Sequence, residues 1–341
     1  MTPAPEPSAP PAAAPVVNPT FFNPQIAVIG NFLASVGNNP VQPSPAFQVR
    51  ESEVSFQAVV DPYARADLFL SFNNDGVEVE EGFITFLSLP WQTQAKAGKF
   101  KVQFGKINTL HLHVLPWIDE PLPIDNILLS PDTWAGEGIS VSKVIELPGD
   151  TFSEVYAQVL DGTSGDGLFR GPTKGDLTYN GQYRAFRDFG DDHNLEVGFS
   201  YAYGHNGTSL TNTTSLQNAH LVYRWRPLQG RPYRSFILRS EYFWSQRQQP
   251  DGRQNAQGFF VGGDYQLARQ WFTGARYEFS DRAANAALRD KGVAATLTFM
   301  PSEFSLLRAE YRYRDYAPGI RASEGFLQIQ FAIGAHGAHP F

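Results

Sequence analysis

Apolar and polar residues alternate with a period of two along nearly the whole chain. In the segment 193–203, HNLEVGFSYAY, every second residue from Leu195 to Tyr203 is aromatic or apolar, and the residues between them are polar or small. The segments 216–226, 234–245, 269–280, 289–300 and 303–314 repeat this pattern. Because successive side chains of a strand point to opposite faces, the pattern predicts strands with one apolar and one polar face.

About sixteen segments of this kind can be counted, each about as long as a tilted strand that crosses a bilayer. They lie near residues 24–34, 46–60, 62–72, 77–88, 94–105, 136–144, 152–160, 181–189, 193–204, 216–226, 234–245, 256–267, 269–280, 289–300, 303–314 and 323–334. Aromatic residues often stand near the ends of the apolar face, where a membrane interface favours them. We therefore expect an all-β fold, a transmembrane antiparallel β-barrel of about 16 strands.

The connections between these segments alternate between long and short. The long or polar ones lie at 35–45, 106–135, 161–180, 205–215, 246–255, 281–288 and 315–322. One connection on the long side, Asn73-Asn74-Asp75-Gly76, predicts a tight turn instead. Outer-membrane barrels combine short periplasmic turns, longer outer loops and periplasmic N- and C-termini. A soluble β protein would have no reason to keep every second connection short, and strands of this length without a second layer would leave their apolar faces bare.

Composition narrows the classes of function. The 341 residues include no Cys, which excludes disulfides and thiolate metal sites, and the net charge of −7 at pH 7 argues against nucleic-acid binding. No run of 18 apolar residues occurs, so no transmembrane helix is expected. Residues 1–20 are rich in Pro and Ala and predict a flexible segment ahead of a barrel at 21–341. They lack the pattern of a signal peptide, so we expect that a signal for export to the bacterial outer membrane has been removed.

The connection 106–135 is the longest and the third on the outer side. It carries His111, His113, Trp117, Asp119, Glu120 and Asp125 among several prolines. Stiffened by the prolines, this loop is predicted to fold into the lumen and form its constriction. The opposite polar face predicts an Arg-rich lumen wall, formed by Arg224, Arg226, Arg239, Arg276, Arg308 and Arg312. Further charged lumen candidates are Arg314, Glu53, Glu81 and Glu278. Acidic loop residues that face this wall would create a transverse field, and selectivity would follow from pore size and charge.

The pair His111 and His113 suggests a metal site as well. In an extended segment both rings point the same way, imidazole suits zinc, and Asp119 could supply a third ligand. Alternatively, these histidines line the loop and bond to backbone or carboxylate groups. No enzyme is expected, because the chain has neither a G-x-S-x-G nucleophile elbow nor a phosphate-binding loop that leads into a helix. No cofactor is expected apart from zinc at this loop.

Several stretches between residues 19 and 145 carry a family resemblance. They are PTFFNPQIAVIGNF, FQVRESEVSFQAVVDPYARADLFLSF, VEVEEGFITF, AGKFKVQFGKIN and HLHVLPWIDEPL. They resemble a bacterial outer-membrane porin-like family whose members are often labelled zinc-regulated or TonB-dependent receptors. They are distantly similar to phosphate-selective porins too, which implies a sixteen-stranded pore. A TonB-dependent receptor would need a plug domain and about 22 strands, for which this chain has no room.

These observations predict a passive outer-membrane channel for small polar or anionic solutes. Its expected partners are outer-membrane lipid, a homotrimer of the chain, and the barrel assembly machinery. That machinery would recognise the last strand, in which Leu327, Ile329, Phe331 and Ile333 alternate outward before the terminal Phe341. Two alternatives stay open: a receptor or metal-uptake protein that binds its ligand at the His111/His113 loop, and a barrel scaffold for a partner protein.

Overall fold

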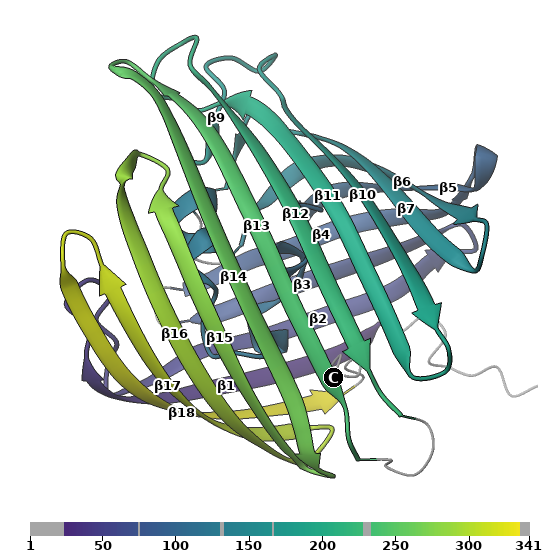
Figure 1. Ribbon diagram of the computed structural model, residues 1–341. Helices are drawn as coiled ribbons and strands as arrows, with labels where there is room; N and C mark the ends of the chain where they lie inside the picture. Colours follow the sequence, from purple (N-terminus) through teal and green to yellow (C-terminus); the bar gives the residue numbers. More distant parts are fainter. Residues whose placement is uncertain (1–23, 74–75, 130–132, 166, 228–232, 335–341) are drawn as a thin grey trace, which may run out of the picture.

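Sixteen antiparallel strands close into one barrel in the computed structural model of the chain (Figure 1). The structure describes residues 24–73, 76–129, 133–165, 167–227 and 233–334. The barrel strands are β1 (Gln25–Asn38), β2 (Phe47–Asp61), β3 (Ala64–Asn73), β4 (Gly76–Leu89), β5 (Thr93–Lys101), β6 (Ala135–Leu147), β7 (Thr151–Leu160), β10 (Thr178–Phe189), β11 (His193–His205), β12 (Thr213–Trp225), β13 (Phe236–Gln249), β14 (Gly252–Ala268), β15 (Trp271–Arg282), β16 (Asn285–Ser302), β17 (Ser305–Tyr316) and β18 (Ile320–Gly334). Each pairs with its neighbours in sequence, and β1 pairs with β18 to close the ring, which confirms the predicted fold class.

The two faces of the strands differ as the alternation predicts. In β18, the outward residues Leu327, Ile329, Phe331 and Ile333 are exposed, and the residues between them, such as Gln328 and Gln330, are buried. An exposed apolar outer face is what the hydrocarbon core of a bilayer requires. This closed barrel with its apolar outer face belongs in the bacterial outer membrane.

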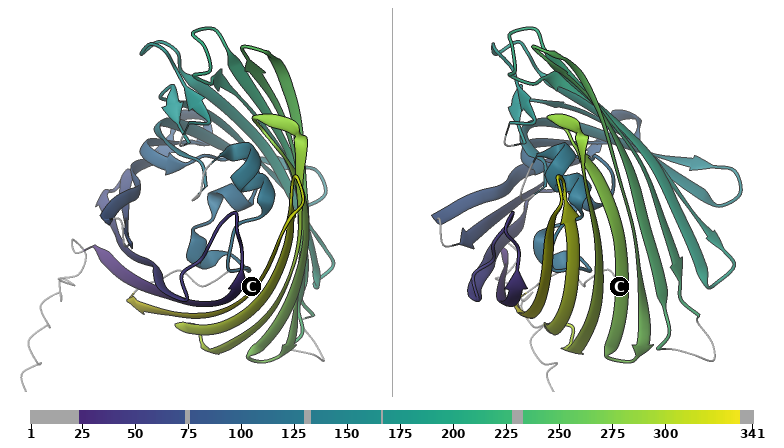
Figure 2. Two further views of the ribbon diagram at one scale, coloured as in Figure 1. Left: turned by 90° about the vertical axis from the view of Figure 1, so that its left-hand side faces the viewer. Right: turned by 60° about the vertical axis from the view of Figure 1, so that its left-hand side comes forward.

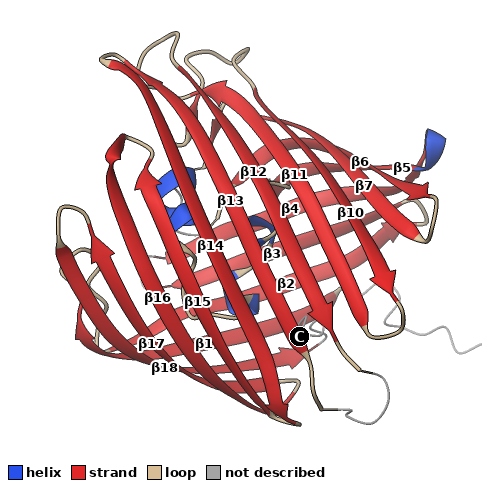
Figure 3. Cartoon of the chain, viewed as in Figure 1, coloured by secondary structure: helices blue, strands red, loops and turns tan. Residues whose placement is uncertain are grey.

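Short helices and one small sheet complete the described elements (Figure 3). They are η1 (Pro90–Gln92), η2 (Ile107–Thr109), η3 (Leu112–Val114), η4 (Ile124–Leu128) and the two-stranded sheet of β8 (Thr163–Ser164) and β9 (Phe169–Arg170). Within the described residues, every helix is too short or too polar to traverse a membrane.

Three connections that the sequence predicts to be long are tight turns. Only residues 250–251 join β13 to β14, residues 283–284 join β15 to β16, and residues 317–319 join β17 to β18. The predictions of loops at 246–255, 281–288 and 315–322 are therefore wrong. The strands continue as polar hairpins, in which backbone pairing goes on after the apolar face has ended; Arg247 pairs with Gln254 in one of them. Without an apolar face, such strand ends look like loops in the sequence.

Residues 226–235 join β12 to β13 on the rim where β1 begins and β18 ends. The predicted flexible segment 1–20, the residues 335–341 that include Phe341, and part of that connection, residues 228–232, lie outside the described residues.

Candidate functional site

The connection between β5 and β6 lies inside the ring of strands. We call its residues 102–134 loop L3; residues 130–132 of it are not described. Figure 2 shows this segment within the barrel, against the strands of the second half of the chain. Its apolar side chains form the main buried cluster of the described residues together with inward residues of the wall, among them Leu216, Phe243 and Phe260. L3 is thus a packed part of the interior.

The first part of L3 is fixed to the wall by polar contacts. The Gly105 amide donates to Ser200 Oγ at 3.0 Å, and the Ile107 amide donates to the Glu241 carboxylate at 2.7 Å. Lys106 Nζ pairs with Glu196 at 3.0 Å. Gly105 has a φ of +68°, which favours glycine, and a Cβ at this position would stand 2.1 Å from Glu241 Oε2, so a larger residue would have to displace this carboxylate.

Asp119 holds the middle of L3 against β15 and β17. Its carboxylate pairs with Arg276 at 2.8 Å, with Arg312 at 2.5 Å and with Arg314 at 2.6 Å. All four side chains are buried, and Glu278 and Glu324 supply further carboxylates to the same arginines. Burial by itself would raise the pKa of Asp119, but the three guanidinium groups hold it well below its ordinary value.

Trp117 lies two residues before this carboxylate and is fully buried. Its ring meets Phe260 edge to face at 5.7 Å, and the guanidinium of Arg276 stands 4.9 Å from the ring centroid. Arg308 donates to the carbonyls of Leu115 and Trp117 at 3.0 and 3.2 Å. Arginine side chains of the wall therefore clamp L3 through its backbone as well as through its charge.

The predicted Arg-rich wall is thus divided between different roles. Arg276, Arg308 and Arg312 are covered by L3 and contact it directly. The sequence predicts instead that acidic loop residues and the arginine wall face each other across a water-filled lumen. Arg239 pairs with Asp264, and Arg224 bonds to Asn194 and pairs with Glu196. Arg226 follows the last residue of β12 and is exposed.

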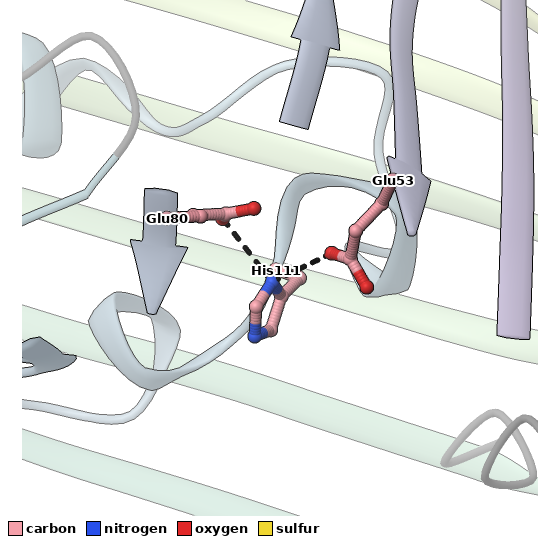
Figure 4. Close-up of side chains that lie close together, drawn as sticks. All are labelled: Glu53, Glu80 and His111. Carbon is pink, nitrogen blue, oxygen red and sulfur yellow. Dashed lines mark ion pairs between the residues drawn. The ribbon is translucent and has the colours of Figure 1, made fainter. Parts of the chain in front are cut away.

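His111 lies at a second anchor of L3, beside Glu53 of β2 and Glu80 of β4 (Figure 4). Its Nδ1 is 2.9 Å from Glu53 Oε2 on β2 and 3.1 Å from Glu80 Oε1 on β4, and its Nε2 bonds to Glu81 at 2.8 Å. Burial and the nearby Lys101 oppose the charged imidazole, yet the three carboxylates raise the pKa of His111 well above its ordinary value.

His113 completes this group, with Nδ1 3.5 Å from Glu53 Oε2, whereas Asp119 does not join it. The two histidines lie together, with ring centroids 5.6 Å apart, whereas Asp119, which the sequence offers as a third ligand, lies at the other anchor. The alternation does not single out Glu80, because a bulge in β4 disturbs it: Phe69 pairs with Glu81 and Leu70 with Val79, which leaves Glu80 without a paired residue on β3. Both neighbouring glutamates can then reach the same imidazole.

The remaining predicted loop residues lie near the Asp119 anchor. Glu120 is buried, and its backbone carbonyl accepts a bond from Arg314 at 3.1 Å. Asp125 is half-buried in η4. Burial, aided by the charges of Asp119 and Glu278, raises the pKa of Asp125 to about 6 in spite of the nearby Arg314.

A polar cavity of about 420 Å³ lies on the inner side of β2 to β7. Its lining includes Arg65, Asp67, Lys96, Glu154 and, from L3, Gln103. Arg65 pairs with Asp67, and Glu154 pairs with Arg184. Lys96 Nζ stands 3.7 Å from the centroid of the Phe83 ring, and no carboxylate of the described residues lies within ion-pair distance of it. Lys96 is therefore a cation of the cavity lining without an ion pair among the described residues.

Comparisons with known proteins agree with this fold. No protein-family model matches the chain. A protein of Aquifex aeolicus without an assigned function is 26% identical over 337 residues, which cover 86% of this chain and 70% of that protein. The anion-selective porin from Comamonas acidovorans superimposes with a TM-score of 0.63 at 10% identity, over 90% of this chain and 98% of the porin. The outer-membrane protein OmpT of Vibrio cholerae with loop L8 deleted gives a TM-score of 0.62 at 11% identity, over 91% and 99% of the two chains. A trimer form of OmpT is also similar, with a TM-score of 0.59 and 12% identity over 91% and 100% of the two chains. At this identity the likeness establishes the sixteen-stranded porin fold.

Proposed function

We propose that the protein is a porin-like channel through which small polar solutes cross the outer membrane by passive diffusion. The observation that carries this proposal is the placement of L3: a loop anchored inside a closed barrel by Asp119 at β15 and β17 and by His111 at β2 and β4. A loop fixed at two separate places narrows the lumen to a defined width without collapsing. The polar cavity beside it offers water-filled space for a solute.

We propose further that small anions are preferred over cations. The predicted arginine wall does not supply this preference, because ion pairs with L3 already neutralise Arg276 and Arg312. Lys96 is the better candidate, since it faces the cavity without a paired carboxylate among the described residues. The similarity to a porin described as anion-selective supports this part of the proposal.

Conductance in planar lipid bilayers tests the channel. The purified chain should give stable, ohmic current steps. Because the chain has no Cys, a single thiol can be placed at will. Gln103→Cys places it at the cavity, where a methanethiosulfonate reagent should lower the conductance, and Leu327→Cys places it on the outer face, where the reagent should have no effect. A barrel that folds but does not conduct would instead favour the receptor or the scaffold.

We propose the homotrimer as the assembled state, supported by the similarity to OmpT in its trimer form. Native mass spectrometry from mild detergent should then give a mass of about three chains, as closed cyclic assemblies do. A chain that is monomeric and still conducts would contradict the proposed homotrimer but support the proposed channel.

A further inference from the structure

The second anchor of L3 brings together more metal-binding groups than a loop contact needs. His111 comes from L3, Glu53 from β2 and Glu80 from β4, and one ligand atom of each lies within 4.8 Å of the other two (Figure 4). All three side chains are largely buried. His113 approaches the same Glu53 oxygen at 3.5 Å. Imidazole and carboxylate are ligands that zinc accepts, and the chain has no thiolate that would compete.

The imidazole of His111 is oriented as a metal ligand would be. One ring nitrogen, Nε2, is bonded to Glu81, an arrangement that in metal sites fixes the ring and leaves the other nitrogen for the ion. That other nitrogen, Nδ1, lies 2.9 and 3.1 Å from two carboxylate oxygens but forms a well-directed hydrogen bond with neither. Glu53 Oε2, on a side chain only 2% exposed, accepts no hydrogen bond from any described residue.

Charge points to a divalent ion. Glu53, Glu80 and Glu81 contribute three negative charges, and Lys101, which pairs with Glu80 at 2.8 Å, contributes one positive charge. Once an ion has replaced the proton of His111, the remaining groups carry two negative charges in a buried place, where uncompensated charge is costly. A divalent cation neutralises them. With bonds of about 2.0–2.2 Å, neighbouring ligand atoms of zinc stand about 3.3 Å apart, close to the spacings around Nδ1.

We propose that His111 Nδ1, Glu53 and Glu80 form a binding site for a divalent cation of the zinc class, with His113 beside it. The ion takes the place of the Nδ1 proton, and Glu81 keeps the ring in position. Because its ligands come from L3, β2 and β4, the bound ion cross-links the loop to the wall. This inference does not depend on conduction, since the site stands on the contacts of the closed barrel alone.

Direct metal binding tests the site. The full chain, folded in detergent and stripped with a chelator, is titrated with zinc chloride by calorimetry, and retained metal is counted by mass spectrometry after gel filtration. One zinc ion per chain is expected. His111→Ala and Glu53→Gln should abolish this binding, and Glu81→Gln should weaken it by about 10–100-fold. Glu78→Gln is the matched control, because Glu78 lies on the same strand but is exposed and pairs with Lys99.

Heat-dependent migration on gels verifies that each variant has folded. Glu53→Gln preserves the size of the side chain, so it decides the question if His111→Ala does not fold. Saturable binding that persists in folded Glu53→Gln or His111→Ala would overturn the proposal and place the ion elsewhere, for instance at His336 and His339. Absence of binding in the unaltered chain would overturn it as well, and the group would then be a cluster of ion pairs that holds L3.

Discussion

At the scale of single residues, Asp119 contributes more to the position of L3 than any other predicted loop residue. It alone faces three buried arginines. Asp119→Asn keeps the shape but removes the charge, and breaking a buried ion pair from one side costs about 3–5 kcal/mol. We expect the free energy of unfolding, measured by urea titration in lipid vesicles, to fall by about that amount. Glu303→Gln, at an exposed turn, should leave it unchanged. Equal stabilities would contradict the role of Asp119 as an anchor.

Asp125 makes L3 sensitive to pH. Its pKa is raised to about 6 by burial and by Asp119 and Glu278, and Arg314 only partly offsets this. The folded chain therefore holds this proton more tightly than the unfolded chain, so stability falls as pH rises from about 4 to about 6. We expect conductance noise to increase over the upper part of this range, as a half-buried negative charge appears beside the carboxylates. In Asp125→Asn this increase of the conductance noise with pH should disappear. If it persisted in that variant, it would come from the titration of another group.

At the scale of elements, β14 is shaped to receive L3. Gly258 and Gly262 both face inward. A Cβ on Gly258 would stand 2.9 Å from Pro123, and one on Gly262 would stand 2.2 Å from the Trp117 ring. Glycine in a strand often marks such a close approach. The loop can therefore lie directly on the backbone of the strand.

Gly262→Ala should displace Trp117 and lower the free energy of unfolding by about 1–3 kcal/mol, as overpacking does. The readout is the midpoint of urea unfolding, together with tryptophan fluorescence. Gly181→Ala is the control, because a Cβ at that strand glycine would meet no atom nearer than 3.8 Å. A smaller effect at Gly262 than at Gly181 would show that L3 is not packed against β14 in solution.

The sequence predicts the strands well, because their pattern is local, but it does not predict contacts between residues that are far apart along the chain. The alternation in 193–203 identifies β11 because each residue reports its own face. The bulge at Glu80 cannot be recognised in the sequence, because one extra residue shifts which side chains point inward without changing the composition of the segment. The contact of Asp119 with Arg314 joins residues 195 positions apart, and no local pattern encodes such pairing. The sequence thus predicts that L3 enters the lumen but not which residues hold it there.

At the scale of the whole molecule, the arginines of the wall that contact L3 are already bound to carboxylates or to the loop backbone. Arg276, Arg312 and Arg314 bind L3, and Lys101 of β5 pairs with Glu80. What remains for a passing solute is the cavity on the inner side of β2 to β7, with Lys96 on its wall. In the proposed channel, selectivity would then depend on unpaired charges at the cavity, such as Lys96, more than on the net charge of −7.

Lys96→Glu tests this dependence. A unit charge about 4 Å from an ion in water is worth about 1 kcal/mol, which corresponds to roughly fivefold in a permeability ratio, before screening by salt reduces it. We expect the ratio of chloride to potassium permeability, obtained from the reversal potential in a potassium chloride gradient, to fall several-fold. Lys291→Glu makes the same change of charge at an exposed position of β16 and should leave the reversal potential in place. An equal shift in both variants would mean that net charge sets the selectivity, whereas no shift in Lys96→Glu would show that the ions do not pass the cavity that Lys96 lines.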